Sequence, residues 1–316
     1  MSGAVARRYA DSHCFWSIKM PHMKEEFDSL VSRTPLSEPV GRRAFMQATL
    51  GAGFAAAVLP VMAQTVIKTD GDGLTAGQIE IDVNGQCMPV YRAQPTGKSD
   101  LPVILVVSEI FGVHEHIADV ARRFAKQGYL ALAPELFVRQ GDPRAYPALG
   151  DLIAKVINKV PDAQVMGDLD ACVAWARAHG GNAGKLGVTG FCWGGRIAWL
   201  YAAHNPRVKA GVAWYGRLVA STSGNNPALT PHQPIDIAAS LQVPVLGLYG
   251  GKDGGIGQDS IEQMQAALAK GDSHSEFVVY PNSGHAFFAD YRPSYVEADA
   301  LDGWQRCLDW FRAHGV

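Results

Sequence analysis

The sequence predicts a doubly wound α/β domain, with a mostly parallel sheet and helices on both of its faces. Apolar runs of strand length alternate with longer amphipathic runs of helix length from about residue 100 onward, and no internal repeat is present. Runs such as Leu101–Val107 are apolar almost throughout, which is typical of central parallel strands buried on both faces. Small and polar residues directly follow several of these runs, at the sheet edge where such folds bind ligands.

The first elements are expected to open the sheet with an antiparallel edge hairpin. Residues 77–83 alternate between apolar and polar side chains, an Asn-Gly turn signal follows, and residues 88–93 continue as a second strand. Leu101–Val107 is then the first central strand. A helix is expected at 115–127, because its apolar residues recur at helical spacing and a glycine follows it.

The rest of the chain continues the alternation of strands and helices. Residues 135–161 are polar and rich in turn residues, so we expect a variable cap region there that is partly helical near 152–160. Residues 216–240 are expected to form a loop. The other expected strands are 129–134, 185–189, 208–215, 243–249 and 276–280, and the other expected helices are 162–179, 196–204, 259–270 and 294–314.

Composition excludes several classes of function. The chain has 316 residues, of which 47% are hydrophobic, and a formal net charge of −2, so it can bury one large core and shows no charge excess that would favour nucleic acid. Its five cysteines are far apart, so neither a disulfide framework nor a zinc site is expected. His114 and His116 lack the i,i+4 spacing of a helical zinc pair and are expected at the surface or a pocket rim. We expect no metal and no cofactor.

Residues 1–63 are interpreted as an N-terminal extension with an export signal, and residues 64–316 as the folded domain. Twin arginines, Arg42 and Arg43, precede a phenylalanine and an uncharged, Ala/Gly-rich run at 47–62. This order resembles a twin-arginine export signal.

The export signal is expected to be cleaved near Ala63, before Gln64, because residues of small or modest size occupy the −3 and −1 positions relative to the cleaved bond. The twin-arginine export machinery is then a partner, the location is periplasmic, and no stable membrane insertion remains after cleavage. The alternative is a membrane anchor, but the uncharged run is shorter than the ~20 residues of a spanning helix and Pro60 interrupts it. Met20 and Met23 are alternative translation starts.

The sequence G-F-C-W-G-G at 190–195 lies between a predicted strand and a predicted helix. Gly190 and Gly194 leave the backbone room for a tight turn, and Cys192 at its apex is expected to project outward on a strained backbone. The pattern G-x-C-x-G is the nucleophile elbow of α/β-hydrolases, with cysteine in place of serine.

Two further polar residues follow predicted strands, Asp253 and His285. The chain order of nucleophile, acid and histidine is the order of the α/β-hydrolase triad. A thiol with its reference pKa of about 8.5 is mostly protonated at neutral pH, whereas the thiolate is the attacking species. His285 is therefore expected to accept the proton of Cys192, and Asp253 to fix the tautomer of His285. The reference pKa of His285, about 6.5, predicts a rate dependence near pH 6–7.

Two backbone N–H groups are expected to form an oxyanion hole. One belongs to Trp193, after the nucleophile, and the other to Ile110, in the turn after the first central strand. Glu109 precedes Ile110 at an otherwise apolar strand end, where an unpaired carboxylate would be costly to bury. It is either a capping or salt-bridging residue or a partner of the Cys192 thiol.

The chain resembles the dienelactone hydrolase family over about residues 74–316. The resemblance rests on E-I-F-G at 109–112, on G-F-C-W-G-G at 190–195, on Asp253, and on His285 with its neighbours. The whole chain looks similar to the exported, twin-arginine branch of that family. The resemblance implies an α/β-hydrolase fold and the hydrolysis of an enol-lactone, of the carboxymethylenebutenolide type, to an open-chain keto diacid.

The resemblance also implies roles for residues of the site. Cys192 would form an acyl-enzyme without a cofactor, and the amides of Ile110 and Trp193 match the oxyanion hole of the family. The glutamate at the Glu109 position would hold the resting thiol and help to generate the thiolate when substrate binds.

The substrate-binding residues depart from the pattern of the family. Members with known activity bind the substrate carboxylate with arginines, and one of these positions is Ala289 here; the residue after the histidine is Ala286 instead of serine. Arg292 is one substitute candidate, and Arg139 and Arg144 are the candidates in the cap region, where the alternative is that they are surface or loop charges. Phe287 is a further candidate for substrate contact.

Three alternative functions remain. The first is a non-catalytic binding protein with this fold. The second is a serine-esterase-like general carboxylesterase that acts on other acyl substrates, and the third is a thiol peroxidase. A peroxidase would need a resolving cysteine, but Cys172 and Cys307 lie on the expected core faces of helices.

Overall fold

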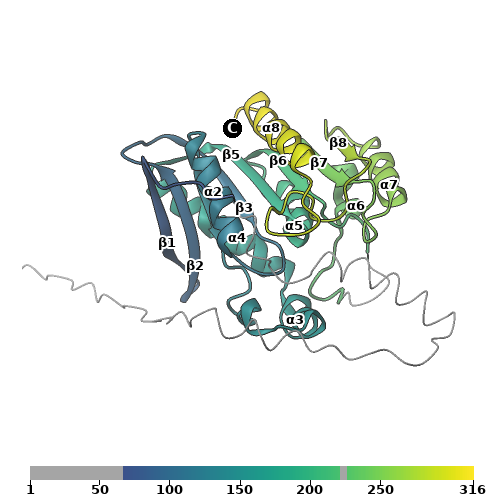
Figure 1. Ribbon diagram of the computed structural model, residues 1–316, viewed down its shortest axis with the longest axis horizontal. Helices are drawn as coiled ribbons and strands as arrows, with labels where there is room; N and C mark the ends of the chain where they lie inside the picture. Colours follow the sequence, from purple (N-terminus) through teal and green to yellow (C-terminus); the bar gives the residue numbers. More distant parts are fainter. Residues whose placement is uncertain (1–66, 221–225) are drawn as a thin grey trace, which may run out of the picture. The chain divides into compact units, whose positions relative to one another are not determined.

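The computed structural model describes residues 67–220 and 226–316, which form a layered α/β domain (Figure 1). The twin-arginine segment and the boundary expected at residue 63 lie outside the described residues, and they stay predictions.

The core of the domain is an eight-stranded sheet. β1 (Leu74–Val83) and β2 (Gln86–Pro95) form the antiparallel hairpin expected at one edge, and β2 also pairs antiparallel with β4 (Leu130–Pro134). All further pairs are parallel. The spatial order is β1-β2-β4-β3-β5-β6-β7-β8, and the remaining strands are β3 (Leu101–Val107), β5 (Gly181–Phe191), β6 (Val208–Trp214), β7 (Val245–Gly250) and β8 (Glu276–Tyr280).

The burial of the strands follows their place in the sheet. β4 and β7 are buried at every residue, as expected for parallel strands covered on both faces. β1 alternates between more and less exposed residues, as expected for an edge strand with one covered face.

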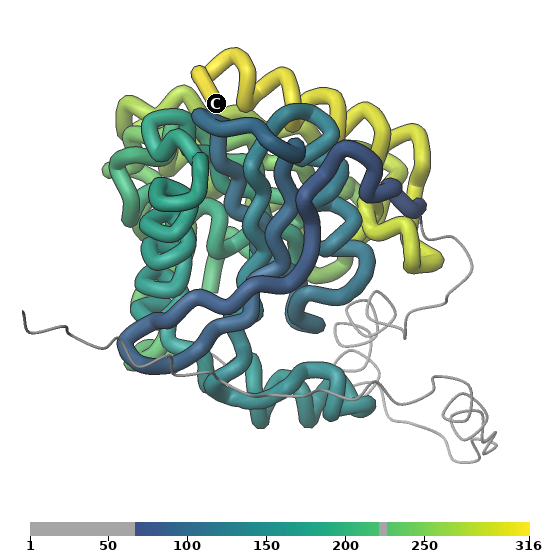
Figure 2. Tube along the Cα trace, turned by 90° about the vertical axis from the view of Figure 1, so that its left-hand side faces the viewer, coloured from purple at the N-terminus to yellow at the C-terminus, as the bar shows by residue number. Residues whose placement is uncertain are grey.

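Helices cover both faces of the sheet, which confirms the predicted fold class (Figure 2). On one face lie α2 (Glu115–Lys126) and α8 (Glu297–Ala313), which meet where the ring of Phe124 packs 4.6 Å from that of Trp304. On the other face lie α4 (Asp162–Ala178) and α5 (Trp193–His204), joined by a hydrogen bond of 2.9 Å from the Tyr201 hydroxyl to Asp170. α7 (Gln258–Leu268) packs against α6 (Pro234–Ile237) and η3 (Ala238–Ser240).

The cap region is partly helical, as expected, and contains the short pieces η1 (Pro143–Ala145), α3 (Leu149–Lys155) and η2 (Ile157–Lys159). Two other segments differ from the expectation. The loop expected at 216–240 contains α6 and η3 near its end. β5 begins at Gly181 rather than at residue 185, because Leu101 of β3 extends the pairing to it.

In the described ranges, no helix is both long enough and apolar enough to cross a membrane. The same residues hold no group of three or more His, Cys, Asp or Glu side chains placed to bind a metal ion.

Candidate active site

The turn between β5 and α5 holds Cys192 in a strained conformation. Its φ is 54° and its ψ is −111°, a region that residues with a side chain rarely adopt. A Cβ on Gly190 would lie 2.0 Å from the carbonyl oxygen of Gly194, and one on Gly194 would lie 2.3 Å from that of Val107, so only glycine fits at either position. The N–H of Cys192 donates to the carbonyl of Trp214 at 3.0 Å, which ties the turn to the end of β6.

Asp253 and His285 meet at the same edge of the sheet. Asp253 follows β7 and His285 follows β8, and parallel strands bring their carboxyl ends together. His285 Nδ1 lies 2.7 Å from Asp253 Oδ2, so the carboxylate accepts the Nδ1–H bond and fixes the tautomer. The other oxygen of Asp253 accepts the N–H groups of Gly255 and Ile256 at 2.8 and 3.2 Å, which holds the carboxylate in place.

The Cys192 sulfur is the other partner of the His285 imidazole. Burial by itself would lower the pKa of His285, but Cys192, through charge and a hydrogen bond, and Asp253 together raise this pKa to about 10. The imidazolium therefore persists at neutral pH, where it can pair with a thiolate. A rate dependence near pH 6–7, which the reference pKa predicts, would require a lower pKa of His285 than this one, and it stays a prediction.

Two backbone N–H groups, those of Trp193 and Ile110, are the candidates for the oxyanion hole. Trp193 is the first residue of α5, where an N–H has no partner within the helix. Within the part of the chain that the structure describes, neither this N–H nor that of Ile110 donates to another backbone carbonyl. This agrees with an oxyanion hole formed by these two N–H groups, which stays a prediction.

Glu109 is buried among three polar side chains. The hydroxyl of Tyr291 donates to Glu109 Oε2, and the same oxygen lies 3.6 Å from His114 Nε2 and 3.7 Å from an Nη of Arg292. Burial would raise the pKa of Glu109, but Arg292, His114 and Tyr291 hold it well below its ordinary range. These are the contacts of a salt-bridging residue, and among the described residues no recorded contact joins Glu109 to Cys192.

Arg292 is buried beside this carboxylate rather than open to a ligand. Its guanidinium lies 4.9 Å from the ring centre of Phe111 and 5.0 Å from that of Tyr291, in cation–π geometry. The positive charge predicted to bind substrate is therefore already matched by Glu109.

The surface or rim position expected for His116 is wrong. Only 2% of His116 is exposed, and its Nδ1 lies 2.9 Å from Asp290 Oδ1. Arg123 also donates to Asp290, at 2.6 Å, so α2 is anchored to the loop that follows His285. Sequence spacing could not reveal this pair, because its members lie 174 residues apart.

Residues 88–315 match the dienelactone hydrolase family. The chain belongs to the dienelactone hydrolase family. A relative from Methylorubrum extorquens, named "Putative carboxymethylenebutenolidase", is 56% identical over 289 residues, which cover 91% of this chain and 97% of the relative. A protein of the same name from Escherichia coli K12 is 52% identical over 272 residues, 85% of this chain and 98% of the relative. The protein is therefore a hydrolase of the dienelactone hydrolase type.

Solved structures agree with this assignment. The crystal structure titled "Putative Dienelactone Hydrolase" from Klebsiella pneumoniae is 54% identical, with a TM-score of 0.73, and the match covers 76% of this chain and 99% of that one. A dienelactone hydrolase-like phosphotriesterase from metagenomic libraries is only 20% identical, with a TM-score of 0.62 over 77% of this chain and 99% of that one, and shows the fold alone.

Two other residues predicted to bind substrate have different partners in this member of the family. Arg139 donates to Asp168 at 2.6 Å and to Gln86 at 2.5 Å. Phe287 is fully buried, and its ring lies 5.5 Å from that of Tyr215. These contacts favour structural roles, and a substrate contact by either residue stays a prediction.

Sequence reasoning missed two residues that follow β6. Tyr215 is buried with φ at 39°, and its ring meets the imidazole of His285 edge-on at 5.1 Å. Arg217 is half-buried, and its charge interacts with Cys192. Their position within a few residues of the end of a parallel strand was the available signal, since Cys192, Asp253 and His285 also follow the ends of such strands.

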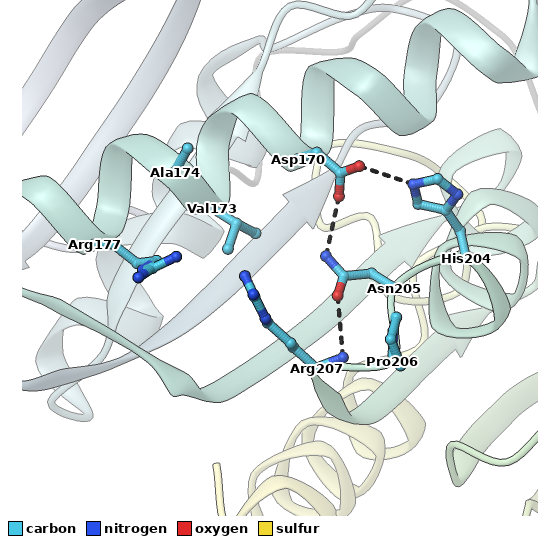
Figure 3. A pocket seen from close by; sticks show the side chains of 8 residues that line it. All are labelled: Asp170, Val173, Ala174, Arg177, His204, Asn205, Pro206 and Arg207. Carbon is cyan, nitrogen blue, oxygen red and sulfur yellow. Dashed lines mark hydrogen bonds and ion pairs between the residues drawn. The ribbon is translucent and has the colours of Figure 1, made fainter.

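A surface hollow of about 340 Å³ lies at the opposite edge of the sheet (Figure 3). It is built from the second half of α4, the end of α5 and the residues that lead into β6, so it lies where the strand begins. The candidate catalytic residues lie at the other ends of the strands, so the hollow is not part of the candidate active site. It is lined by Asp170, Val173, Ala174, Arg177, His204, Asn205, Pro206 and Arg207.

Proposed function

We propose that the protein hydrolyses an ester or enol-lactone through a Cys192–His285–Asp253 triad and an acyl-cysteine intermediate. The observation that carries this proposal is the His285 ring, which joins the Asp253 carboxylate to the strained Cys192 at one sheet edge. Such an arrangement supplies a nucleophile, its base and the group that orients the base.

The reaction begins with the thiolate of Cys192 and the imidazolium of His285. The sulfur adds to the substrate carbonyl carbon, and the oxygen that becomes negative accepts hydrogen bonds from the N–H groups of Ile110 and Trp193. The carbon–oxygen bond of the ester or lactone then breaks. The leaving oxygen takes the proton of His285.

Water completes the reaction by attacking the thioester carbonyl. His285, now neutral, accepts a proton from the water, and the carbon–sulfur bond breaks to release the acid and the Cys192 thiolate. With an enol-lactone the leaving oxygen remains in the product as an enol, which converts to the ketone. The product is an open-chain keto acid, and a keto diacid when the substrate carries a carboxylate.

Glu109 supports this site as a fixed charge in the conformation described. Its carboxylate holds Tyr291 and Arg292, while Cys192 interacts with His285. In the dienelactone hydrolase family the corresponding glutamate is expected to hold the resting thiol. The contacts of Glu109 here are consistent with a state in which the sulfur of Cys192 interacts with His285 instead of Glu109.

The test compares wild-type protein with Cys192→Ala on cis- and trans-dienelactone and on p-nitrophenyl acetate. Cys192→Ala is expected to lose turnover about 1000-fold or more, because the attacking atom is removed. Cys87→Ala, which removes a thiol from β2, is the matched control and should retain activity.

A rapid quench should trap the acyl group on the peptide that contains Cys192, as a mass increase. Equal turnover by Cys192→Ala would overturn the cysteine mechanism. Binding of the lactones without turnover by wild-type protein would favour a non-catalytic binding protein. Turnover of simple esters alone would favour a general carboxylesterase.

A further inference from the structure

We propose that Arg217 binds a negatively charged group of the substrate, a carboxylate, next to Cys192. This inference rests on the proposed function, since it assigns the part of the acyl group that the triad does not touch. It names a residue different from Arg292 and Arg139, which the sequence favours.

The position of Arg217 follows from the pairing of β5 and β6. Phe191, the last residue of β5, pairs in register with Trp214, the last residue of β6. The chain therefore leaves β6 level with the nucleophile elbow, and the N–H of Cys192 bonds to the carbonyl of Trp214 at 3.0 Å. Arg217 lies three residues beyond this contact.

The backbone on both sides of Arg217 is fixed. The carbonyl of Gly216 accepts a hydrogen bond from the Tyr249 hydroxyl at 3.0 Å, and a Cβ on Gly216 would lie 2.3 Å from the carbonyl carbon of Gly195. On the other side, Leu218 is fully buried, and its carbonyl accepts the N–H of Ile235 at 3.0 Å. A side chain that projects from a backbone fixed on both sides can bind a ligand with a smaller loss of conformational entropy.

The charge of Arg217 lacks a carboxylate partner among the described residues. The neighbouring Arg196 donates twice to Asp162, at 2.8 and 2.7 Å, and Arg292 faces Glu109. The groups that act electrostatically on the charge of Arg217 are the Cys192 sulfur and the like-charged Arg196. Burial lowers the pKa of Arg217, Cys192 raises it and Arg196 lowers it, so its charge is partly desolvated and incompletely compensated.

A half-buried guanidinium in this situation favours an anionic ligand. Its planar fork matches the two oxygens of a carboxylate, and a charge-assisted pair is strongest where water is partly excluded. The expected substrate class is therefore an ester or lactone whose acyl part carries a carboxylate.

The first readout compares two esters of equal chain length, mono-p-nitrophenyl adipate, which is anionic, and p-nitrophenyl hexanoate, which is neutral. Arg217→Gln is expected to lower kcat/KM for the adipate about 10-fold or more and to change it less than about 3-fold for the hexanoate. Arg207→Gln is the matched control, since it removes an exposed arginine at the opposite edge of the sheet and should affect neither ester. An equal change on both esters would overturn the inference.

The second readout does not depend on turnover. Iodoacetate and iodoacetamide alkylate Cys192 by the same displacement of iodide, and they differ mainly in one negative charge. The ratio of the iodoacetate rate to the iodoacetamide rate should fall about 5- to 10-fold in Arg217→Gln and stay constant in Arg207→Gln. An unchanged ratio would overturn the inference whether or not esters are hydrolysed. A lowered ratio in a protein that hydrolyses no ester would uphold the inference and refute the proposed function.

Discussion

At the scale of single residues, backbone strain gathers around the thiol. Cys192, Tyr215 and Ala286 all have positive φ, at 54°, 39° and 60°, and they follow β5, β6 and β8. The other described non-glycine residues with positive φ are Asn84 and Asp100, whose side chains tolerate this region in turns. Strain that has no such local reason marks the catalytic edge as a place where geometry is imposed by the surrounding fold.

The protonation of His285 gives a test at this scale. Its pKa, raised to about 10, means that the imidazolium persists through neutral pH and is lost only as the pH rises through about 10. Cys192 is the largest cause of the increase, so Cys192→Ala should move the titration of His285 to lower pH. Titration of ¹⁵N-labelled histidine by NMR, with His285→Gln to assign the signal, measures both midpoints. A wild-type midpoint near 6.5 that Cys192→Ala leaves in place would contradict the paired state.

The buried arginines show why a charge pattern in sequence does not identify a substrate site. Arg292 is close to His285 in sequence, yet its guanidinium already pairs with Glu109 and lies against two aromatic rings. Removal of Arg292 would leave the Glu109 carboxylate buried without its counter-charge, which is strongly destabilising in general. Loss of activity in Arg292→Ala would therefore not be evidence for substrate binding.

At the scale of elements, the elbow depends on close approach of β5, α5 and β3. Gly190→Ala would place a methyl group 2.0 Å from the carbonyl oxygen of Gly194. The backbone must move to relieve this clash, so we expect a loss of about 3 kcal/mol or more in the free energy of unfolding, together with loss of activity. Urea denaturation followed by circular dichroism measures the change.

Gly167→Ala is the control for the elbow substitution. Gly167 lies within α4, and no atom lies within 4 Å of the added methyl group, so this variant should be more stable by about 0.5–1 kcal/mol. If Gly190→Ala proved as stable as Gly167→Ala, the tight turn would not be a requirement of the fold.

A second element-scale feature joins α2 to the loop that carries the histidine. Asp290 accepts a hydrogen bond from Arg123 of α2 and contacts His116 of the same helix. The loop after β8 is therefore tied to α2. Burial would raise the pKa of Asp290, but His116 and Arg123 lower it, which keeps the carboxylate charged. The helix thereby contributes to the placement of His285 although it supplies no residue of the triad.

At the scale of the whole molecule, the sequence predicted the sheet well because its central strands are continuous apolar runs. β3 and β8 have the predicted ends, 101–107 and 276–280, and α2 and α4 end within one residue of the prediction. The same argument predicted that loops after parallel strands converge, and Asp253 and His285 do meet there.

The parts that could not be predicted depend on contacts between residues far apart in the chain. Arg139 pairs with Asp168, and His116 with Asp290, through tertiary packing that the local sequence pattern does not predict. The pKa of His285 likewise depends on its neighbours rather than on its type. The short helical pieces α6 and η3 were also not predicted, because each has too few turns to show a helical period in the sequence.

Export is the remaining prediction for the whole molecule. The twin-arginine route transports folded proteins, so the domain could reach the periplasm with the Cys192 thiol already placed. Arg42→Lys combined with Arg43→Lys should leave the precursor in the cytoplasm, whereas the wild-type chain should be processed near Ala63 and recovered from the periplasm.

The chain offers its own control for this experiment. Arg7 and Arg8 form a second arginine pair, but no apolar run follows them, so their replacement by lysine should not affect export. Cell fractionation and N-terminal sequencing of the recovered protein measure both variants. Recovery of an uncleaved chain in the membrane fraction would instead support the anchor, since a retained segment at 47–62 would hold the folded hydrolase at the membrane.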